Sequence, residues 1–560
     1  MATLGIPTHA RPEALRRALG SFARDLAESG RAARCERDVD EGRTDILVVD
    51  DVVGGPHDGA SLAAAREIGA RFGVLVRHAD RREAERFAGE LAAESGAPIE
   101  IVRAAIVAGG RVEPAFGAAR NLLLLDAAGR CSLQVDDDTV CAIAPAPEAR
   151  EGLALRSFED PTEMWFDSAH CGPLDELATA AAGVGYVDLH ERMLGARASA
   201  LVGGFVAADR GDGDAAWANG ARVGKRVATS GSDSDTARAS GAREGGVAED
   251  GRARLAGGVD LRAASSALMR RIAAGGRVGV TQLGVRGDGA IGGMSALLTL
   301  PAASRARLLA SEAGYRRAIE SRRLARAASS ATLTEQELCM TIAIGLDGRD
   351  VLPPFAPVGR NEDGLFGSVL ATVDPRLVLG HLPFTIAHEP PEARGGPFTR
   401  IFDEPARLGV NEVLAGLIGS SRAEIDVRSR RAAIESLGRC LIAWSELPAQ
   451  DVLERVSWML GQRLARRLAR IEALLREARR APSYWADDLE ELASTIRDRA
   501  EEPERAIPAE LRARLTTREA REETMRRVSE YGQILLWWPT LVDAARALKR
   551  RGRGLGERPS

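Results

Sequence analysis

The chain has 560 residues, of which 45% are hydrophobic and 28% are charged. These fractions are ordinary for soluble globular proteins and exclude collagen-like, disulfide-scaffold and globally disordered classes. Lysine and arginine number 76 against 80 aspartates and glutamates, which gives a formal net charge of −4. So balanced a charge lacks the positive field that general nucleic-acid binding needs, and we expect no nucleic-acid partner.

The cysteines and the apolar segments favour a cytoplasmic protein. None of the six cysteines forms a CxxC or CxxH pair, so neither a zinc motif nor a redox motif is predicted. Scattered cysteines fit a reducing compartment. The N-terminus lacks a basic region followed by an apolar one, and the apolar stretch 534–542 is interrupted by Pro539 and too short to span a bilayer.

The first 145 residues alternate apolar runs with stretches of helical periodicity, which predicts an α/β fold with a mainly parallel sheet between helices. Strands are expected at 4–7, 46–49, 74–76, 99–102 and 131–135. Helices are expected from Pro12 onward and across 81–93 and 116–126. Two of these strands, 46–49 and 131–135, run directly into carboxylates.

The rest of the chain is less regular until it becomes helical. A short helix is expected at 188–194, a mobile Gly/Ser/Asp-rich loop at 208–258, ordered structure at 278–300 and a helical stretch at 303–327. Beyond residue 408 the pattern is helical almost to the end. Apolar residues from Val452 to Leu475 trace one face of a long amphipathic helix.

The carboxylates after the two strands are the first candidates for chemistry. In an open parallel sheet, ligands bind outside the carboxyl ends of the strands, where Asp50-Asp51 and Asp136-Asp137-Asp138 are expected. Like charges in a row repel one another unless a cation lies among them, and a hard divalent ion carrying diphosphate oxygens meets that need. A solvated acidic turn is the alternative for either group alone, and two such groups in one sheet favour a site.

Four segments together resemble the nucleotide-sugar-binding half of a family 2 glycosyltransferase of the GT-A fold. They read Gly-Ile-Pro-Thr-His-Ala-Arg-Pro at 5–12, Ile-Leu-Val-Val-Asp-Asp at 46–51, Gly-Ala-Ala-Arg-Asn at 117–121 and Val-Asp-Asp-Asp-Thr at 135–139. The likeness covers residues 1–145 and returns at 341–390. His9-Ala10 replaces the Tyr-Asn common in that family, so the aromatic place beside the base falls to a histidine.

The resemblance assigns roles in donor binding. Pro7 and Thr8 would line the nucleotide base, and Asp51 would accept a hydrogen bond from the base edge. Arg120 and Asn121 would close the floor of the nucleotide pocket.

The acidic row corresponds to the family's Asp-x-Asp motif. The resemblance implies that Asp136 faces the ribose and the metal, that Asp138 binds the metal, and that Asp137 between them belongs to the donor pocket. The ion would be Mn²⁺ or Mg²⁺, which offsets the diphosphate charge and stabilises the charge that develops as the nucleoside diphosphate leaves.

A second acidic element, Arg-Asn-Glu-Asp-Gly at 360–364, is similar to the place where the family carries its catalytic base. Aligned on the acid before glycine, Asp363 is the candidate base and Glu362 its neighbour. A base that removes the acceptor proton contributes about 10²–10⁴-fold to the rate. The alternative is a helix N-terminus whose acids offset the helix dipole.

His388 resembles the histidine that completes the metal shell in several GT-A enzymes, and His381 is a weaker candidate. A buried structural histidine is the alternative for both. Because this histidine occurs in inverting and in retaining enzymes, the stereochemistry stays open. Asp288, in a glycine-rich stretch, and His190 are further candidates for a substrate-facing surface.

The resemblance implies a metal-dependent glycosyltransferase that uses a nucleotide sugar, with a UDP-sugar as the expected donor, and a glycan, lipid-linked or small-molecule acceptor. The expected parts are a nucleotide-sugar-binding half (1–147), an insertion or acceptor region (148–340), the remainder of the catalytic domain (341–408) and an α-helical C-terminal region (409–560). A GT-A-fold nucleotidyltransferase and a degenerate, non-catalytic scaffold are the alternatives.

The C-terminal helices are expected to pack on the catalytic domain or to bind a partner. The long helix carries a basic face that could contact anionic lipid at a membrane surface, or could be an ordinary solvated helix face. Its arginines are Arg463, Arg466, Arg467 and Arg470.

Overall fold

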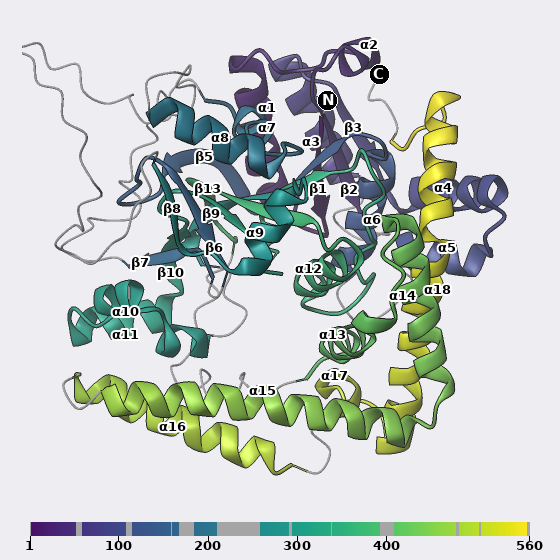
Figure 1. The fold of residues 1–560 in the computed structure, drawn as a ribbon. Helices are drawn as coiled ribbons and strands as arrows, with labels where there is room; N and C mark the ends of the chain where they lie inside the picture. Colours follow the sequence, from purple (N-terminus) through teal and green to yellow (C-terminus); the bar gives the residue numbers. More distant parts are fainter. Residues whose placement is uncertain are drawn as a thin grey trace, which may run out of the picture.

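The computed structural model describes residues 2–51, 59–107, 115–157, 160–166, 184–209, 258–289, 294–337, 339–391, 408–477, 481–502 and 506–556. Most of the loop predicted at 208–258 lies outside these residues. The described chain forms an α/β structure in which helices cover both faces of a large mixed sheet (Figure 1).

The sheet has the order β3-β2-β1-β4-β12-β9-β13-β11-β6-β8, and β5, β7 and β10 pair at its side. Its first four strands are parallel; beyond them β12 runs antiparallel to β4 and β9, whereas β9 and β13 are parallel. The strands are β1 Ala2–Thr8, β2 Asp45–Asp50, β3 Val76–Ala79, β4 Cys131–Val135, β5 Thr139–Pro145, β6 Leu153–Arg156, β7 Glu163–Phe166, β8 Val259–Ala263, β9 Arg277–Asp288, β10 Arg323–Ala327, β11 Ala331–Thr334, β12 Ala343–Asp347 and β13 Leu377–His388.

Alternation along the strands divides the apolar residues between two cores. In β2, Ile46 and Val48 face a core with α1, α3, α7 and α9, and Leu47 and Val49 face a core with α4–α6, α12–α14 and α18. The helices are α1 Pro12–Glu28, α2 Glu36–Asp40, α3 Ala60–Phe72, α4 Arg81–Ser95, α5 Ile99–Ile106, α6 Phe116–Asp126, α7 Tyr186–Glu191, α8 Ala198–Asp209, α9 Ser266–Ala273, η3 Met294–Thr299, α10 Ala302–Leu308, α11 Glu312–Ser321, α12 Glu362–Val373, α13 Val410–Ser421, η5 Arg422–Glu424, α14 Arg430–Glu446, α15 Ala449–Glu477, α16 Ser483–Ala500, α17 Ala509–Arg512 and α18 Thr517–Arg550.

Two sequence predictions about single elements are wrong. The strand predicted at 99–102 is the start of helix α5, which begins after Pro98 and whose buried residues Val102, Ala105 and Ile106 follow helical spacing. The helical stretch predicted at 303–327 ends earlier, and its last five residues form β10, which pairs with β7 and β9. For β10, pairing with two strands far along the chain decides that the segment is a strand.

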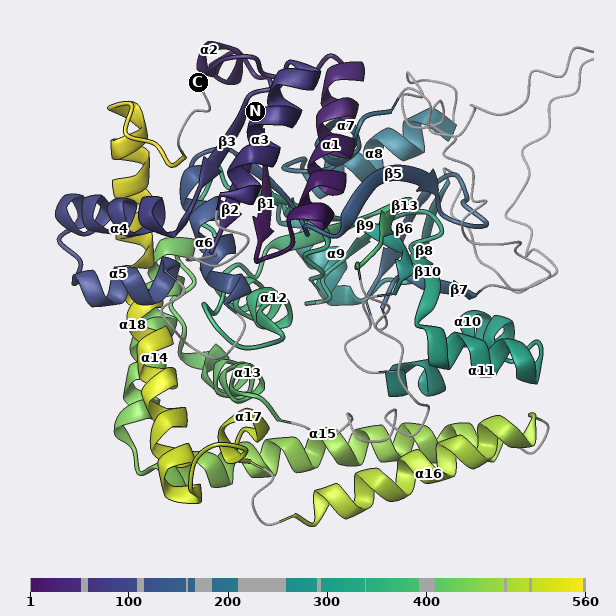
Figure 2. The same ribbon diagram turned by 180° about the vertical axis from the view of Figure 1, so that it is seen from behind.

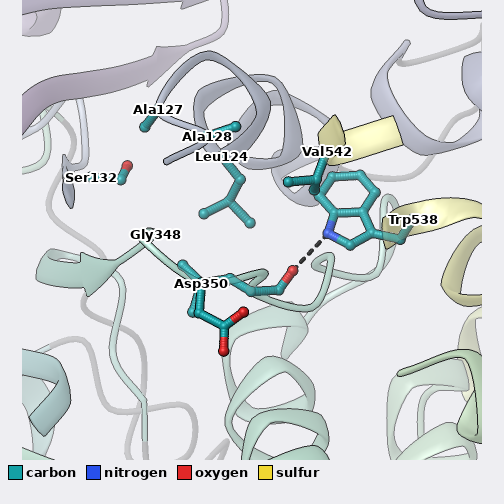
Figure 3. A pocket seen from close by; sticks show the side chains of 9 residues that line it. Leu124, Ala127, Ala128, Ser132, Gly348, Asp350, Trp538 and Val542 are labelled. Atoms are coloured by element: carbon teal, nitrogen blue, oxygen red, sulfur yellow. Dashed lines mark hydrogen bonds between the residues drawn. The ribbon is translucent and has the colours of Figure 1, made fainter. Parts of the chain in front are cut away.

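The C-terminal helices pack on the rest of the protein. α18 lies along α14 and reaches α4, α5 and α6 despite Pro539 within it, while α15 and α16 form an arm that extends to η3, α10 and α11 (Figures 1 and 2). Figure 3 shows the hollow where α18 meets α6: the indole Nε1 of Trp538 donates to the Leu352 carbonyl oxygen at 2.7 Å. This hollow adjoins Ser132 near the start of β4, at the opposite end of that strand from Asp136.

None of the described helices combines the length and the apolar character needed to cross a membrane.

Candidate metal-binding site

The acids predicted to form a site gather where the strand order reverses. β1 lies between β2 and β4, all three parallel, so Thr8, Asp51 and Asp136 are placed at the same edge of the sheet. A reversal of strand order in an open α/β sheet opens a crevice outside the carboxyl ends of the strands. Pro7 stays buried within β1, opposite Val49 of β2.

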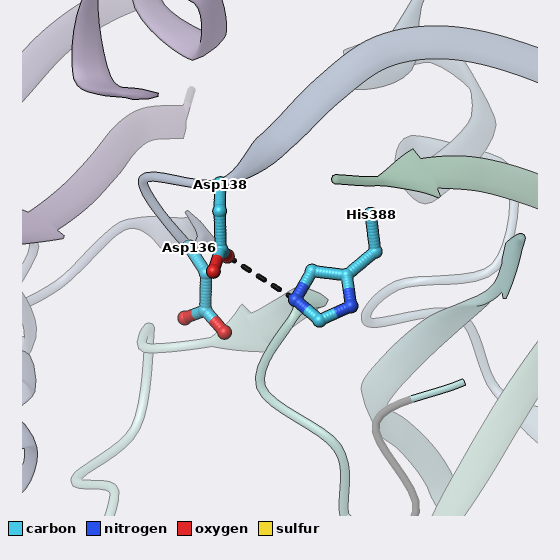
Figure 4. A group of neighbouring side chains, drawn as sticks. All are labelled: Asp136, Asp138 and His388. Carbon is cyan, nitrogen blue, oxygen red and sulfur yellow. Dashed lines mark ion pairs between the residues drawn. The ribbon is translucent and has the colours of Figure 1, made fainter. Parts of the chain in front are cut away.

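Three side chains converge at the end of β4: Asp136, Asp138 and His388 (Figure 4). One carboxylate oxygen of each aspartate and one ring nitrogen of His388 all lie within 4.8 Å of one another. Opposite ligands of a small divalent ion lie about 4.2 Å apart, given metal–ligand distances of about 2.1 Å. A slight contraction therefore brings all three side chains within the coordination shell of one ion.

The sheet itself brings His388 to the acidic turn. β13 runs antiparallel to β5, with His388 opposite Thr139, the residue after Asp138. The backbone N–H of Glu389 donates to the Asp138 carbonyl oxygen at 2.8 Å. The register of two strands far apart in the sequence thus fixes the contact.

The imidazole of His388 is oriented for ligation. Its Nδ1 lies 2.8 Å from the carbonyl oxygen of Asp288 and must donate there, so in the neutral ring Nε2 keeps its lone pair. Nε2 lies 3.2 Å from Oδ1 of Asp138. Burial lowers the pKa of His388, but the hydrogen bond and charge of Asp138 outweigh burial, so the pKa lies above its usual value. The space between Nε2 and the two carboxylates therefore attracts a cation, which can be a proton on Nε2 or a metal ion.

Arg11, to which the sequence analysis assigned no role, contacts Asp137 and Asp138 of the acidic row. Its Nη1 lies 3.2 Å from Oδ1 of Asp137 and 3.2 Å from Oδ2 of Asp138. Thr8 Oγ1 donates to Asp137 Oδ2 at 2.8 Å. Burial and the charge of Asp138 raise the pKa of Asp137 to about 6, against the hydrogen bond from Thr8. The place of Arg11 in the turn after the first strand was the available signal.

Arg120 connects the two acidic elements. Its Nη2 donates to Asp136 Oδ1 at 2.5 Å, its Nη1 to Gln134 Oε1 at 3.3 Å, and its Nε lies 4.0 Å from Glu362 Oε1. The guanidinium is almost fully buried, with a side-chain exposure of 3%. Arg120 is thus the cation that faces Asp136 and Glu362, 226 residues apart in the sequence.

Glu362 and Asp363 form the first turn of α12, beside this arginine. Burial and the neighbouring charge of Asp363 raise the pKa of Glu362 to about 7, and burial also raises the pKa of Asp363. Asp363 Oδ1 accepts a hydrogen bond from the backbone N–H of Gly364 at 2.8 Å. Asn361 before them has a φ of 63°, a left-handed conformation that strained, functional backbone often adopts.

Asn121 and Gly117 attach α6 to the loop that precedes these acids. The Asn121 side chain donates to the carbonyl oxygens of Ala105 and Phe355 and accepts from the N–H of Phe355, at 2.8–3.0 Å. A Cβ on Gly117 would lie 1.8 Å from the Ala356 carbonyl oxygen. Asn121 was predicted to close the nucleotide pocket. Its side-chain amide instead hydrogen-bonds to backbone groups, so Asn121 positions the loop before Glu362 rather than facing a ligand.

Asp51 lies beside His9, directly after the end of β2. The two side chains are in contact, and burial raises the pKa of Asp51 against the opposing effect of His9. A small hollow opens next to Asp51. Besides Asp51 it is lined by Val49, Asp50, Arg81, Ala84, Ile106, Val107, Ala118, Ala119 and Leu122.

The remaining candidates, two histidines and Asp288, contribute no side chain to the metal cluster. His190 is fully buried, with its pKa lowered to about 3 by burial and with Nδ1 2.7 Å from Thr281 Oγ1. Burial also lowers the pKa of His381 to about 4. Asp288 serves the site through its backbone carbonyl, while its side chain lies 3.2 Å from Nη2 of Arg322.

Chemically, this arrangement can hold a divalent cation at Asp136, Asp138 and His388, beside two buried carboxyl groups with raised pKa values. No protein-family model matches the sequence, and neither a curated protein nor a solved structure shows significant similarity to it.

Proposed function

We propose that this protein is a metal-dependent glycosyltransferase of the GT-A type that uses a nucleotide-sugar donor. The observation that carries the proposal is the convergence of Asp136, Asp138 and His388 at the reversal of strand order, next to Glu362 and Asp363. The parallel order β3-β2-β1-β4 is compatible with a nucleotide-binding α/β fold. The motifs that resemble family 2 glycosyltransferases lie on these same elements.

The donor set fits Mn²⁺ and, less readily, Mg²⁺, because it offers two carboxylate oxygens and one neutral imidazole nitrogen. The tautomer imposed by the Asp288 carbonyl directs the free nitrogen toward the carboxylates. When bound, such an ion offsets the negative charge of a diphosphate leaving group.

The donor would bind with its base beside Asp51 and its diphosphate at the acidic row. The hollow beside Asp51 lies at the end of β2, one strand from β1 and two from β4. Arg11 at the acidic row offers its guanidinium group to phosphate oxygens, and Arg81 lines the hollow assigned to the base.

In the transfer step, the acceptor oxygen forms a bond to the anomeric carbon and the bond from that carbon to the diphosphate oxygen breaks. The acceptor proton passes to a carboxylate, for which Asp363 is our candidate and Glu362 the neighbour. Their raised pKa values, caused mainly by burial, bring them closer to neutral pH, where a general base works best. This assignment describes an inverting transfer; a retaining enzyme would use the same donor site.

The direct test is a panel of nucleotide sugars with Mn²⁺, in which release of the nucleoside diphosphate is monitored. We expect release from one class of donor, with UDP-sugars as the first to test, and loss of release on addition of EDTA. Thermal shift should show stabilisation by the matching nucleoside diphosphate only with the metal, and Asp138→Ala should remove that coupling. Asp363→Asn should retain the coupling while transfer falls about 10²–10⁴-fold.

Other outcomes would assign the site differently. Release of pyrophosphate in a reaction of a nucleoside triphosphate with a sugar phosphate would make the protein a nucleotidyltransferase. Metal-dependent nucleotide binding without turnover of any donor would favour a non-catalytic scaffold. Absence of stabilisation by every nucleotide tested would contradict the proposal as a whole.

A further inference from the structure

The hollow beside Asp51 has a mostly apolar lining with a few polar groups. Seven of its ten lining residues are valine, isoleucine, leucine or alanine, and the other three are Asp50, Asp51 and Arg81. Small-molecule sites commonly combine an apolar lining with a small number of polar groups that fix the orientation of the ligand. A nucleotide base suits this composition, because its ring faces are apolar and its edges carry donors and acceptors.

Of the three polar residues, Asp50 is engaged inside the protein. It is buried, and its carboxylate accepts a hydrogen bond from the hydroxyl of Ser61 in α3. The same hydroxyl oxygen lies 2.8 Å from Nε2 of His78 in β3. These contacts hold Asp50 between β2, β3 and α3, so Asp51 and Arg81 are the polar side chains available to a ligand in the hollow.

Asp51 and Arg81 occupy equivalent places at the ends of two neighbouring strands. β2 and β3 are parallel and lie side by side, with Val49 paired with Ala79 (Figures 1 and 2). Asp51 and Arg81 each follow the paired residue by two positions. Because neighbouring strands lie about 4.8 Å apart, the sheet brings a carboxylate and a guanidinium group to the same side of the hollow.

Arg81 has no partner among the residues that the structure describes. Its guanidinium group forms no hydrogen bond and no ion pair there, with Asp51 or with any other side chain. The side chain is half-buried and belongs to the first residue of α4. This is the positive end of the helix dipole, where a cation is disfavoured. A ligand that presents acceptor atoms to Arg81 would supply the missing hydrogen bonds.

Among the common bases, guanine fits a carboxylate and a guanidinium group placed side by side. Its N1–H and N2–H₂ groups are adjacent donors that one carboxylate can accept together, and its O6 and N7 atoms are adjacent acceptors that arginine binds in pairs. Uracil offers one donor between two acceptors, so it satisfies each group only once. Each carboxylate oxygen accepts two hydrogen bonds, so the contact of Asp51 with His9 leaves room for the base.

We propose that this hollow binds the guanine base of the donor, with Asp51 accepting from N1–H and N2–H₂ and Arg81 donating to O6 and N7. This inference rests on the proposed function, in which the donor base lies beside Asp51. It makes the donor a GDP-sugar, in place of the UDP-sugar that the sequence resemblance implies.

The first experiment is isothermal titration of the full chain, in the presence of Mn²⁺, with GDP, UDP, ADP and CDP. We expect GDP to bind about tenfold more tightly than the other three, or better. Inosine diphosphate lacks only the 2-amino group of guanine, so it tests the contact with Asp51 and should bind more weakly than GDP. Binding of UDP or of inosine diphosphate as tight as that of GDP would overturn the inference.

Variants then assign the two residues. Arg81→Met should weaken binding of GDP about tenfold or more and leave binding of inorganic pyrophosphate unchanged, because pyrophosphate carries no base. Arg82→Met removes the exposed neighbouring arginine, which does not line the hollow, and is the matched control. Asp51→Asn should reduce the preference for GDP over inosine diphosphate. Equal weakening of GDP and pyrophosphate in Arg81→Met would assign Arg81 to the diphosphate and overturn its role at the base.

The same titrations separate this inference from the proposed function. Absence of Mn²⁺-dependent binding for every nucleoside diphosphate would contradict the proposed function itself. Mn²⁺-dependent binding that favours UDP, ADP or CDP over GDP would overturn only the guanine assignment. Asp138→Ala acts at the metal cluster, so it should weaken binding of all four nucleotides while GDP keeps its advantage. The titrations with the natural sequence decide the base preference even if a variant fails to fold.

Discussion

The Asp288 carbonyl oxygen accepts a hydrogen bond from Nδ1 of His388 at 2.8 Å and thereby decides which nitrogen of His388 faces the acidic row. The carbonyl is held from its own side, because the Asp288 carboxylate lies 3.2 Å from Nη2 of Arg322. Gly287 before it, with a φ of 103°, leaves room for the His388 backbone, since a Cβ there would lie 2.5 Å from its carbonyl oxygen. Backbone groups of β9 thus prepare a ligand on β13.

Replacing His388 by alanine should weaken Mn²⁺ binding about 10–100-fold, the loss commonly seen even for groups that only orient a ligand. Isothermal titration of the full chain with Mn²⁺ measures it. His9→Ala, which removes an exposed imidazole outside the cluster, is the control and should bind as the natural sequence does.

The same titration should depend on pH in one direction. A proton and a metal compete for Nε2 of His388, whose pKa is raised, so affinity should rise as pH rises through that raised value. The pH dependence of His388→Ala should be shallower. A dependence of equal steepness in both proteins would remove His388 from the ligand set.

Gly117→Ala tests the close approach of α6 to the loop before Glu362. The new Cβ would stand 1.8 Å from the Ala356 carbonyl oxygen, so helix and loop must separate and Arg120 must shift. Overpacking of this kind costs about 1–3 kcal/mol or more of unfolding free energy. Urea denaturation measures this loss, and nucleotide binding should weaken as well.

Gly89→Ala in α4 is the matched control, because a Cβ there meets nothing within 4 Å. It should raise stability by about 0.5–1 kcal/mol through helix propensity. An equal change in unfolding free energy for the two substitutions would show that the close approach of Gly117 to the loop does not restrict the side chain at this position.

The sequence predicts the parts of the fold that rest on local patterns. A continuous apolar run such as Ile46 to Val49, followed by acids, predicts a buried strand because a segment this short and apolar is typical of the strands of a parallel sheet. The strand predicted at 99–102 is also rich in β-branched residues but contains Glu100, and it forms the start of α5, of which only one face is buried. β10 is short, and it is a strand because it pairs with β7 and β9. This pairing cannot be predicted from the local sequence pattern.

The candidate site divides in the same way. Asp136 and Asp138 could be found because a carboxylate row after a strand is a local signal. The contact between Asp138 and His388 depends on the register of β5 and β13, and the contact of Arg120 with Asp136 and Glu362 depends on where α12 packs. Arg11 was visible in its motif, but only the turn after β1 shows that it reaches Asp137 and Asp138.

Arg77→Met tests two buried ion pairs that Arg77 forms with Asp45, at the start of β2, and with Asp126. Arg77 donates to Asp45 and to both carboxylate oxygens of Asp126 at 2.7 Å, and to the Leu555 carbonyl oxygen at 2.6 Å. The variant removes the guanidinium from two buried carboxylates, leaving Asp45 with the Thr3 hydroxyl and Asp126 with Lys549 at 3.9 Å, which should cost about 3–5 kcal/mol of unfolding free energy. It should also release the C-terminal segment, so that proteolysis near Leu555 accelerates.

The control for these ion pairs is Arg103→Met, which removes a pair with Glu85 between exposed side chains. Such pairs contribute about 0–1 kcal/mol, so stability and proteolysis should barely change. An equal loss of unfolding free energy in both variants would show that the burial of Arg77 does not strengthen its contribution to stability.

Glu362→Gln should stabilise the protein at neutral and higher pH in the absence of metal. Burial and then the charge of Asp363 raise the pKa of Glu362 from 4.5 to about 7, so the folded state holds this proton more tightly than the unfolded chain does. Across that window the unfolded state binds fewer protons, and the unfolding free energy contributed by Glu362 falls as pH rises. Glutamine cannot ionise, so the variant should lose this dependence, and its unfolding free energy should exceed that of the natural sequence most clearly near pH 8.

Urea denaturation in EDTA at a series of pH values measures the unfolding free energy, with exposed Glu85→Gln as the control. Equal pH dependence of all three proteins would refute the raised pKa of Glu362.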